Sequence, residues 1–174
     1  NVLMSGKKLK IYHGIDPTGR LHIGHMVSLR KLRQLQDLGH EIIVLIGDFT
    51  AMIGDPTGKR TARKPLTRAQ VLANAKEYKK QVGKILDLRK SDIRFLHNEQ
   101  WTNKLKPEDF LELASHFTVA GLLERDMFQE RMKKGETIGL HEPVYPVLQA
   151  YDSVMLKSDF TVIGTDQTFN ELKA

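Results

Sequence analysis

The strongest constraint on the fold is a pair of short apolar segments that flank one segment of helical periodicity. Residues 9–15 and residues 42–46 are apolar and short enough to be strands buried on both faces of a sheet. Between them, apolar side chains recur at the spacing of one helix face, and Gly39 is placed to end that helix. The side chains on this face are Met26, Leu29, Leu32, Leu35 and Leu38. A strand, a helix and a strand in succession indicate a βαβ unit with parallel strands and a right-handed crossover.

The rest of the chain continues this alternation. A helix is predicted over residues 67–86, where Thr67 and Gln70 form a capping box, and a strand is predicted over residues 93–96. The remaining predicted elements are helices over residues 107–114, 119–133 and 143–156, a strand over residues 160–163 and a last helix over residues 166–174. With 174 residues, the chain is long enough for one domain with a real core.

The turn between the first strand and its helix is the first candidate site. Residues 16–19 read Asp-Pro-Thr-Gly, which matches a type I turn, and the helix that follows carries His22 and His25 in its first turn. The free N–H groups at the start of a helix, and the positive end of its dipole, favour an anion. The two histidines stand at i and i+3, so they share one face and can each donate an N–H. This segment is therefore predicted to bind a phosphate group.

A second copy of the turn follows the second predicted strand. Residues 55–58 again read Asp-Pro-Thr-Gly, now followed by Lys59, although this sequence is by itself also a good turn. The segment is not interpreted as a P-loop. Ile53 stands where a P-loop has its first glycine, and Arg60 stands where it has Ser or Thr.

The predicted helix over residues 143–156 carries a stripe of polar side chains. Tyr145, Gln149 and Asp152 stand at i, i+4 and i+7, so they line one face. The neighbouring positions are mostly apolar, which indicates a helix buried nearly all round. We therefore expect the polar stripe to face a cavity.

Composition limits the classes of function. The formal net charge of +6 is compatible with a nucleic acid partner, although lysines on solvated helix faces would give the same balance. The absence of cysteine excludes disulfides, thiolate catalysis and Cys-ligated zinc within these residues. The sequence contains no run of about 18 apolar residues, the length needed to span a bilayer. We therefore expect no membrane partner and a soluble, cytoplasmic protein.

Several of these motifs together resemble one known family. His22-Ile23-Gly24-His25 resembles the HIGH signature of class I aminoacyl-tRNA synthetases, and Tyr12-x-Gly14-x-Asp16-Pro17-Thr18 resembles the version found in bacterial-type tyrosyl-tRNA synthetases. The resemblance continues, in the order of the family, through residues 54–59, through Tyr145-x-x-x-Gln149-x-x-Asp152 and through residues 164–167. It covers nearly the whole chain, and four motifs in register are far more specific than HxGH alone.

The resemblance implies a fold and an activity. The fold would be a Rossmann-like doubly wound parallel sheet of the HUP type, with a helical insertion at about residues 107–142 that forms the interface of a homodimer. The activity would be that of a tyrosine-tRNA ligase, which activates tyrosine with ATP to tyrosyl-adenylate and transfers the tyrosyl group to tRNA(Tyr). Mg²⁺ would accompany ATP, and no tightly bound metal is expected, because His22 and His25 lack further ligands at a suitable spacing.

The resemblance also implies roles for individual residues. Thr18 and His22 would contact the phosphates, and His25 would lie against the ribose and adenine. The residues implied in catalysis are Thr18, His22, His25 and Lys59. The residues implied in ATP binding are Gly14, Asp16, Gly24, Gly164 and Asp166.

The tyrosine site would be formed by side chains from four segments. Tyr12 and Asp152 would hold the substrate hydroxyl, which needs hydrogen-bond partners when it is buried. The α-ammonium group would be bound by oxygen atoms of Asp55, Tyr145 and Gln149. Gln167, with Gly164 and Asp166, would meet the ribose and the substrate carboxyl group.

The chain departs from the family pattern in several places. Ile163 replaces the first of two glycines, and His13 stands where relatives carry a small residue. The chain begins at Asn1 and ends before a KMSKS-like loop or an anticodon-binding domain, so we expect a catalytic-core fragment with little or no activity alone. The apolar side chains expected at a dimer interface, within about residues 110–134, are Leu122, Leu123, Met127 and Phe128.

Three other functions are compatible with parts of the pattern. A tryptophanyl-tRNA synthetase core would share the fold. A nucleotidyltransferase of the same superfamily would keep His22 and His25 but would not need Tyr12, Gln149 and Asp152. A non-catalytic module that only binds tyrosine or RNA would not need the KMSKS-like loop.

Overall fold

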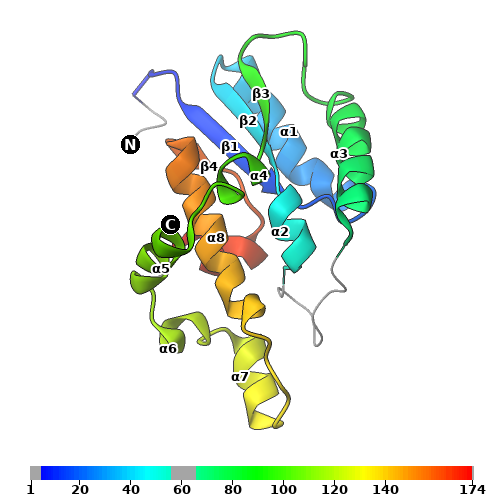
Figure 1. Ribbon diagram of the computed structural model, residues 1–174. Helices are drawn as coiled ribbons and strands as arrows, with labels where there is room; N and C mark the ends of the chain where they lie inside the picture. The colour runs from blue at the N-terminus through cyan, green and yellow to red at the C-terminus, as the bar shows by residue number, and fades with distance from the viewer. Residues whose placement is uncertain (1–4, 56–65, 174) are drawn as a thin grey trace.

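Four parallel strands form the centre of the protein. The computed structural model describes residues 5–55 and 66–173 (Figure 1). The strands are β1 (Lys10–Ile15), β2 (Glu41–Ile46), β3 (Ile93–His97) and β4 (Phe160–Thr161), in the spatial order β3-β2-β1-β4. All three neighbouring pairs are parallel, which confirms the predicted sheet.

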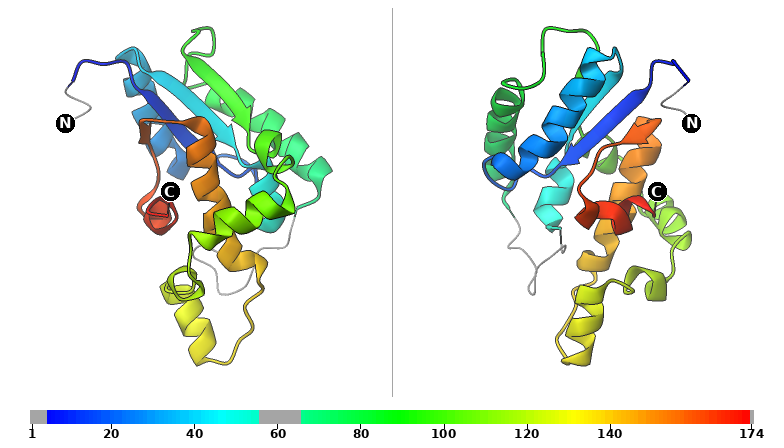
Figure 2. Two further views of the ribbon diagram at one scale, coloured as in Figure 1. Left: turned by 60° about the vertical axis from the view of Figure 1, so that its left-hand side comes forward. Right: turned by 180° about the vertical axis from the view of Figure 1, so that it is seen from behind.

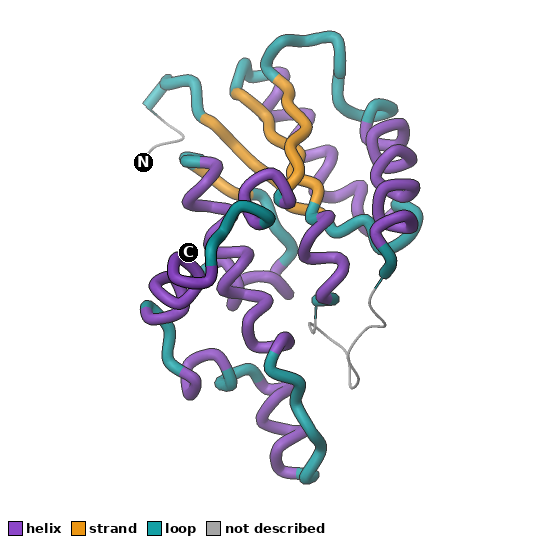
Figure 3. The backbone as a smooth tube through the Cα atoms, in the orientation of Figure 1, coloured by secondary structure: helices purple, strands orange, loops and turns teal. Residues whose placement is uncertain are grey.

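Helices cover both faces of this sheet, as expected for a doubly wound fold (Figure 3). The helices that border the sheet or the site are α1 (Ile23–Asp37), α2 (Asp48–Ile53), α3 (Arg68–Val82), α4 (Glu99–Thr102) and α8 (His141–Leu156). The others are α5 (Pro107–Ser115), α6 (Val119–Leu122), α7 (Asp126–Lys133) and α9 (Thr168–Glu171), with a 3₁₀ turn, η2 (Thr165–Gln167), before α9. Figure 2 shows α6 and α7 farthest from the sheet, beyond the end of α8.

The two faces of the sheet contribute to two separate cores. Side chains alternate between the faces of a strand, so Ile42, Val44 and Ile46 of β2 pack with α1 and α3. Ile43 and Leu45 lie on the opposite face, with Trp101 of α4 and Leu156 of α8. The apolar runs of the sequence are thus strands buried on both sides.

Helix α3 confirms its predicted start and corrects its predicted end. Thr67 is the N-cap, and the capping box with Gln70 is present. The helix ends at Val82 rather than near residue 86, and Gly83 follows in a turn packed closely against the side chain of Leu88. Tyr78 is buried in the core.

The predicted helix over residues 119–133 is two helices, α6 and α7. Arg125 interrupts it with an extended backbone, at φ −60° and ψ 135°. Its guanidinium group donates to Asn170 Oδ1 at 3.1 Å and lies over the ring of Phe169. These partners are distant in the sequence, so no local pattern could reveal the break.

Smaller differences occur at the ends of elements. Met26 and Leu38 were expected on the buried face of α1 but are exposed, because they lie near its two ends, where the sheet no longer covers the helix. The last strand is shorter than predicted, and the last helix is divided into η2 and α9. The short helices α2 and α4 were not predicted. Within the described ranges 5–55 and 66–173, no helix has the length and apolar character needed to cross a membrane.

The strand order determines where a ligand can bind. The chain passes from β1 to β2 and β3 on one side, whereas β4 pairs with β1 on its other side. Connections that leave β1 and β4 in opposite directions open a crevice at the carboxyl ends of these strands. The motifs at residues 16–25 and 164–167 follow these two strands directly.

The buried face of α1 gives a test of this packing. Leu32 is 0% exposed, whereas Val27 of the same helix is 75% exposed. We expect Leu32→Ala to lower the free energy of unfolding by about 2–5 kcal/mol through the lost contacts and the cavity left behind. Val27→Ala should change it by less than about 0.5 kcal/mol. Urea unfolding of both variants would measure this, and equal effects would contradict the assigned face.

Candidate active site

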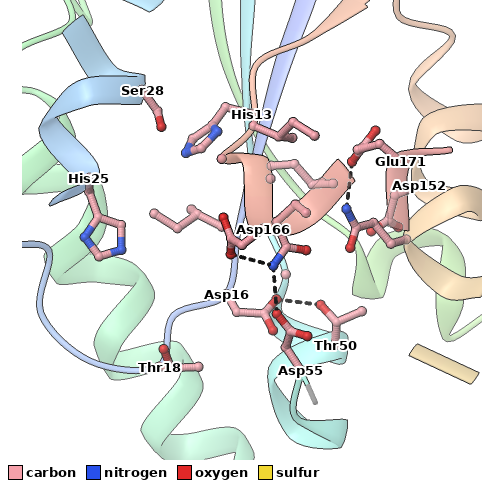
Figure 4. A pocket seen from close by; sticks show the side chains of 18 of the residues that line it. His13, Asp16, Thr18, His25, Ser28, Thr50, Asp55, Asp152, Asp166 and Glu171 are labelled. Carbon is pink, nitrogen blue, oxygen red and sulfur yellow. Dashed lines mark hydrogen bonds between the residues drawn. The ribbon is translucent and has the colours of Figure 1, made fainter. Parts of the chain in front are cut away.

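A single cavity of about 460 Å³ opens at the carboxyl ends of β1 and β4, within the range of small-molecule sites (Figure 4). It gathers all the predicted site residues that the structure describes. They are Tyr12, Gly14, Asp16, Thr18, His22, Gly24, His25, Asp55, Tyr145, Gln149, Asp152, Gly164, Asp166 and Gln167. Lys59, predicted as catalytic, lies outside the described residues. Figure 4 shows His25 and Ser28 at one end of the cavity and Asp152 and Glu171 at the other.

The two histidines form a reciprocal cap at the start of α1. His22 is the N-cap residue, one position before the helix, rather than part of its first turn as predicted. Its Nδ1 accepts from the N–H of Gly24 at 3.2 Å, and Nδ1 of His25 accepts from the N–H of His22 at 3.2 Å. The ring centroids are 4.1 Å apart.

This cap fixes where each ring carries its hydrogen. In a neutral ring, an Nδ1 that accepts a hydrogen bond leaves the hydrogen on Nε2. Burial, and then repulsion by His22, lowers the pKa of His25, which favours the neutral ring. His22 and His25 therefore present two Nε2–H donors at one end of the cavity.

Asp16 connects three elements in the middle of the site. Its carboxylate accepts from Tyr145 Oη at 2.9 Å and from Thr50 Oγ1 at 2.7 Å. Burial, and then the charges of Asp16 and Asp55, raise the pKa of Tyr145 well above its ordinary value, so its hydroxyl remains a donor. Gly47 is required beside them, because a Cβ at this position would overlap the Asp16 carboxylate.

Gln167 connects η2 to the segment after α2. Its Nε2 donates to Asp55 Oδ2 at 3.1 Å, and its Oε1 accepts from Asn170 Nδ2 at 2.9 Å. Asp55 and Gln167, which are far apart in the sequence, are thus direct neighbours.

Asp152 lies at the opposite end of the cavity and is only 4% exposed. Its two oxygens accept from Trp101 Nε1 at 2.7 Å and from Asn98 Nδ2 at 3.1 Å. Burial raises the pKa of Asp152 to about 7, although these two hydrogen bonds act in the opposite direction. The hydrogen bonds from Trp101 and Asn98 hold the carboxyl group in one orientation.

Tyr12 has partners that the sequence did not suggest. Its hydroxyl lies 2.6 Å from Ser153 Oγ and 2.9 Å and 3.0 Å from the two carboxylate oxygens of Glu171. Gln149 Nε2 donates to the same carboxylate at 2.7 Å. Tyr12 and Asp152 both line the cavity but are held by different partners, so a shared contact with one ligand group stays a prediction.

Sequence reasoning missed several residues of the site. Gly47 and Thr50 follow β2, and Asn98 follows β3, so a search for polar residues at the carboxyl end of every strand could have found them. No local signal distinguishes Ser28 or Glu171 from ordinary helix positions. The remaining cavity residues that the sequence had not assigned to a ligand are His13, Ile15, Leu45 and Ile163.

The site has no arrangement typical of a protein-bound metal ion. Among residues 5–55 and 66–173, no three His, Asp or Glu side chains are grouped so that they could hold one.

Comparison with known proteins agrees with this geometry. A family model described as tRNA synthetases class I (W and Y) matches residues 4–172. The chain belongs to this family. The chain is 53% identical, over 171 residues, to a tyrosine–tRNA ligase of Oleidesulfovibrio alaskensis, and 54% identical, over 166 residues, to tyrosine–tRNA ligase 2 of Clostridium acetobutylicum. These matches cover 98% and 95% of the chain but only 43% and 41% of the relatives' length.

Solved structures show the same fold. A C-terminally truncated mitochondrial tyrosyl-tRNA synthetase of Aspergillus nidulans matches with a TM-score of 0.82 and 27% identity, over 96% of this chain and 51% of that one. A tyrosyl-tRNA synthetase of Archaeoglobus fulgidus complexed with L-tyrosine matches with a TM-score of 0.74 and 25% identity, over 98% and 50% of the two chains.

The raised pKa of Asp152 predicts a pH dependence of the stability of this chain. The folded state binds an extra proton between the unfolded value of about 4 and the folded value of about 7, so the contribution of Asp152 to the free energy of unfolding falls as the pH rises through this window. Asp152→Asn removes this titration. We expect urea unfolding to show a steeper fall with pH for the wild type than for Asp152→Asn.

A matched control is Asp37→Asn, because Asp37 is half exposed on α1, away from the cavity. Its pH profile should follow that of the wild type. Parallel profiles for the wild type and Asp152→Asn would show that Asp152 does not titrate in this window.

Proposed function

We propose that this chain carries the adenylate-forming site of a tyrosine–tRNA ligase. The reaction would join tyrosine to ATP as tyrosyl-adenylate, and the tyrosyl group would then pass to tRNA(Tyr). The observation that carries the proposal is the convergence of residues from separate motifs on one cavity, with histidine donors at one end and a buried carboxyl group at the other. Identities of 53–54% to tyrosine–tRNA ligases favour tyrosine over tryptophan as the substrate.

The end of the cavity with Asp152 is suited to the substrate side chain. A buried phenolic hydroxyl needs partners, and Asp152 and Tyr12 offer oxygen atoms in an almost dry environment. Asp55, Tyr145 and Gln149 line the same cavity and would bind the α-ammonium group. The Archaeoglobus fulgidus relative forms a complex with L-tyrosine, which supports tyrosine as the ligand.

The other end is suited to ATP. In the reaction, a carboxylate oxygen of tyrosine forms a bond to the α-phosphorus, while the bond from this phosphorus to the pyrophosphate oxygen breaks. No covalent enzyme intermediate is needed, so alignment and charge stabilisation suffice. The Nε2–H groups of His22 and His25, with Thr18, would contact the phosphates and ribose as negative charge moves to the leaving pyrophosphate. Gly14, Asp16, Gly24, Gly164 and Asp166 would line the nucleotide site.

Mg²⁺ would enter as the counter-ion of ATP. It would be held mainly by the phosphates. Lys59 would act beside the same phosphates.

Assembly is a further part of the proposal. Residues 107–142 would form the helical insertion of a homodimer that works in the cytoplasm with tRNA. Phe128, expected at the interface, is 0% exposed within the chain. The other expected side chains, Leu122, Leu123 and Met127, are partly exposed, and the exposed apolar side chains of Leu111, Val119 and Met132 would join them in the contact.

The tyrosine assignment is tested by Asp152→Asn. The substitution weakens the pairing of a buried phenolic hydroxyl, so tyrosine binding should weaken by roughly 1.5–3 kcal/mol and discrimination against phenylalanine should fall. Calorimetry with tyrosine, phenylalanine and tryptophan would measure both effects, with Asp37→Asn as the control. Unchanged affinity for tyrosine would contradict the assigned site, and preferential binding of tryptophan would favour the other substrate of the family.

The phosphate assignment is tested by His22→Ala. The substitution removes a hydrogen-bond donor to the negative charge that builds up on the pyrophosphate in the transition state. Tyrosine-dependent ATP–pyrophosphate exchange should therefore fall roughly 10²-fold, while the affinity for tyrosine stays nearly unchanged. The assay should use a chain extended through the KMSKS-like loop beside the present one, because the loop is expected to act only in the transition state. His116→Ala, at an exposed position after α5, is the control. Equal exchange in His22→Ala and wild type would remove His22 from the site.

A further inference from the structure

Asn170 is a buried amide of α9 that lies behind two side chains of the cavity. It is 0% exposed and does not itself line the cavity. Its Nδ2 donates to Gln149 Oε1 at 3.0 Å and to Gln167 Oε1 at 2.9 Å. Gln149 belongs to α8 and Gln167 to η2, so one amide connects two segments of the site. The proposed function does not use it.

The direction of this amide is fixed from outside the cavity. Arg125 Nη1 lies 3.1 Å from Asn170 Oδ1, and a guanidinium group can only donate. The oxygen of Asn170 must therefore face Arg125, and both hydrogens of its Nδ2 face the glutamines. Arg125 is the N-cap residue of α7, between α6 and α7, in the segment predicted as a helical insertion.

The far ends of the two glutamines are fixed in the same sense. Gln149 Nε2 donates to Glu171 Oε1 at 2.7 Å, and Gln167 Nε2 donates to Asp55 Oδ2 at 3.1 Å. An ionised carboxylate can only accept, so each amide nitrogen must face its carboxylate. The hydrogen bonds thus run in one direction, from the guanidinium group through the buried amide and each glutamine to a carboxylate.

These fixed directions make Gln149 a hydrogen-bond acceptor at the cavity. An ammonium group has only hydrogens to donate, so its partners must be acceptors. A carbonyl oxygen has two lone pairs, and Gln149 Oε1 can therefore accept from Asn170 and from a ligand at the same time. If the amide of Gln149 turned over, it would offer N–H groups instead. The contact from Asn170 to Gln167 holds a second acceptor, the carboxylate of Asp55.

We propose that Asn170 is a positioning residue of the α-ammonium site, with its amide held in one direction by Arg125. It orients Gln149 directly, and it orients Asp55 through Gln167. This inference rests on the proposed function, which assigns Gln149 and Asp55 to the α-ammonium group of tyrosine. Asn170 acts through these side chains and does not touch the substrate.

Two ligands that differ only in the α-amino group test this role. Tyrosine carries the group, and 3-(4-hydroxyphenyl)propanoate has the same phenol and carboxylate without it. The ratio of their dissociation constants, measured by calorimetry, reports the binding of the ammonium group alone. The wild type should bind tyrosine more tightly than the propanoate.

Asn170→Asp keeps the size of the side chain, but as a carboxylate it can no longer donate to the glutamines. The preference for tyrosine should fall about fivefold to tenfold, the size of one hydrogen bond. If Asn170→Asp acted only through its charge, the added negative charge would attract the ammonium group and raise the preference. A general loss of packing would weaken both ligands alike and leave the preference unchanged.

A matched control is Asn103→Asp, which adds the same charge at an exposed position after α4. It should keep the preference of the wild type. A fall in Asn103→Asp equal to that in Asn170→Asp would overturn the assignment to Asn170.

Arg125→Met tests the partner that holds Asn170. The substitution removes the donor to Asn170 Oδ1, so the preference for tyrosine should fall about twofold to fivefold. Loss of a positive charge alone would raise the preference. Arg125→Lys keeps a cationic donor and should retain most of it. Arg125 is only partly buried, so this pair decides the question if Asn170→Asp does not fold, as judged by circular dichroism.

Failure of the inference can be told from failure of the proposed function. If the wild type prefers tyrosine, but a folded Asn170→Asp, or Arg125→Met in its place, keeps or raises this preference, the inference is wrong and the tyrosine site stands. If the wild type binds both ligands equally, the assignment of the α-ammonium group is wrong and the inference falls with it. If the wild type binds neither ligand, the tyrosine site itself is wrong.

Discussion

The central position of β1 is the constraint on which the site depends. β1 pairs in parallel with β2 on one side and with β4 on the other, so the segments after β1 and β4 leave the sheet beside each other. Parallel strands align their carboxyl ends, which brings residues separated by about 150 positions in the chain to one edge. Asp16 and Gly164 become neighbours of one cavity for this reason. The helices then have to cover only the two faces of the sheet.

Around that cavity, buried polar groups are held by one another. Asp16 is bound by Tyr145 and Thr50, and Asp152 by Asn98 and Trp101. A buried acceptor without partners is costly, so these contacts stabilise the fold and also fix the orientation of each group. The pKa of Asp152, raised by burial, shows that its ionised form remains strained despite two donors. A site with such preset donors and acceptors can discriminate between ligands of nearly equal size.

Much of the fold followed from local patterns. The apolar runs at β1 and β2 and the capping box at Thr67 were enough to predict the parallel sheet and the start of α3. The break at Arg125, whose partner Asn170 is distant in the sequence, and the end of α3 at Val82 were missed. In the site, the spacing of Tyr145, Gln149 and Asp152 correctly predicted a polar stripe that faces a cavity. Glu171 could not be predicted, since its partners lie on other elements.

The sequence by itself determined the class of fold, the family and many of the residues that line the cavity, because periodicity, turn chemistry and short motifs act within a few residues of the chain. Only the tertiary structure decided which atoms bind to which. The carboxyl group of Asp152 was paired with Trp101 and Asn98, and the hydroxyl of Tyr12 was directed to Glu171. Hydrogen-bond direction depends on distances of about 3 Å between side chains far apart in the sequence, and folding alone fixes those distances.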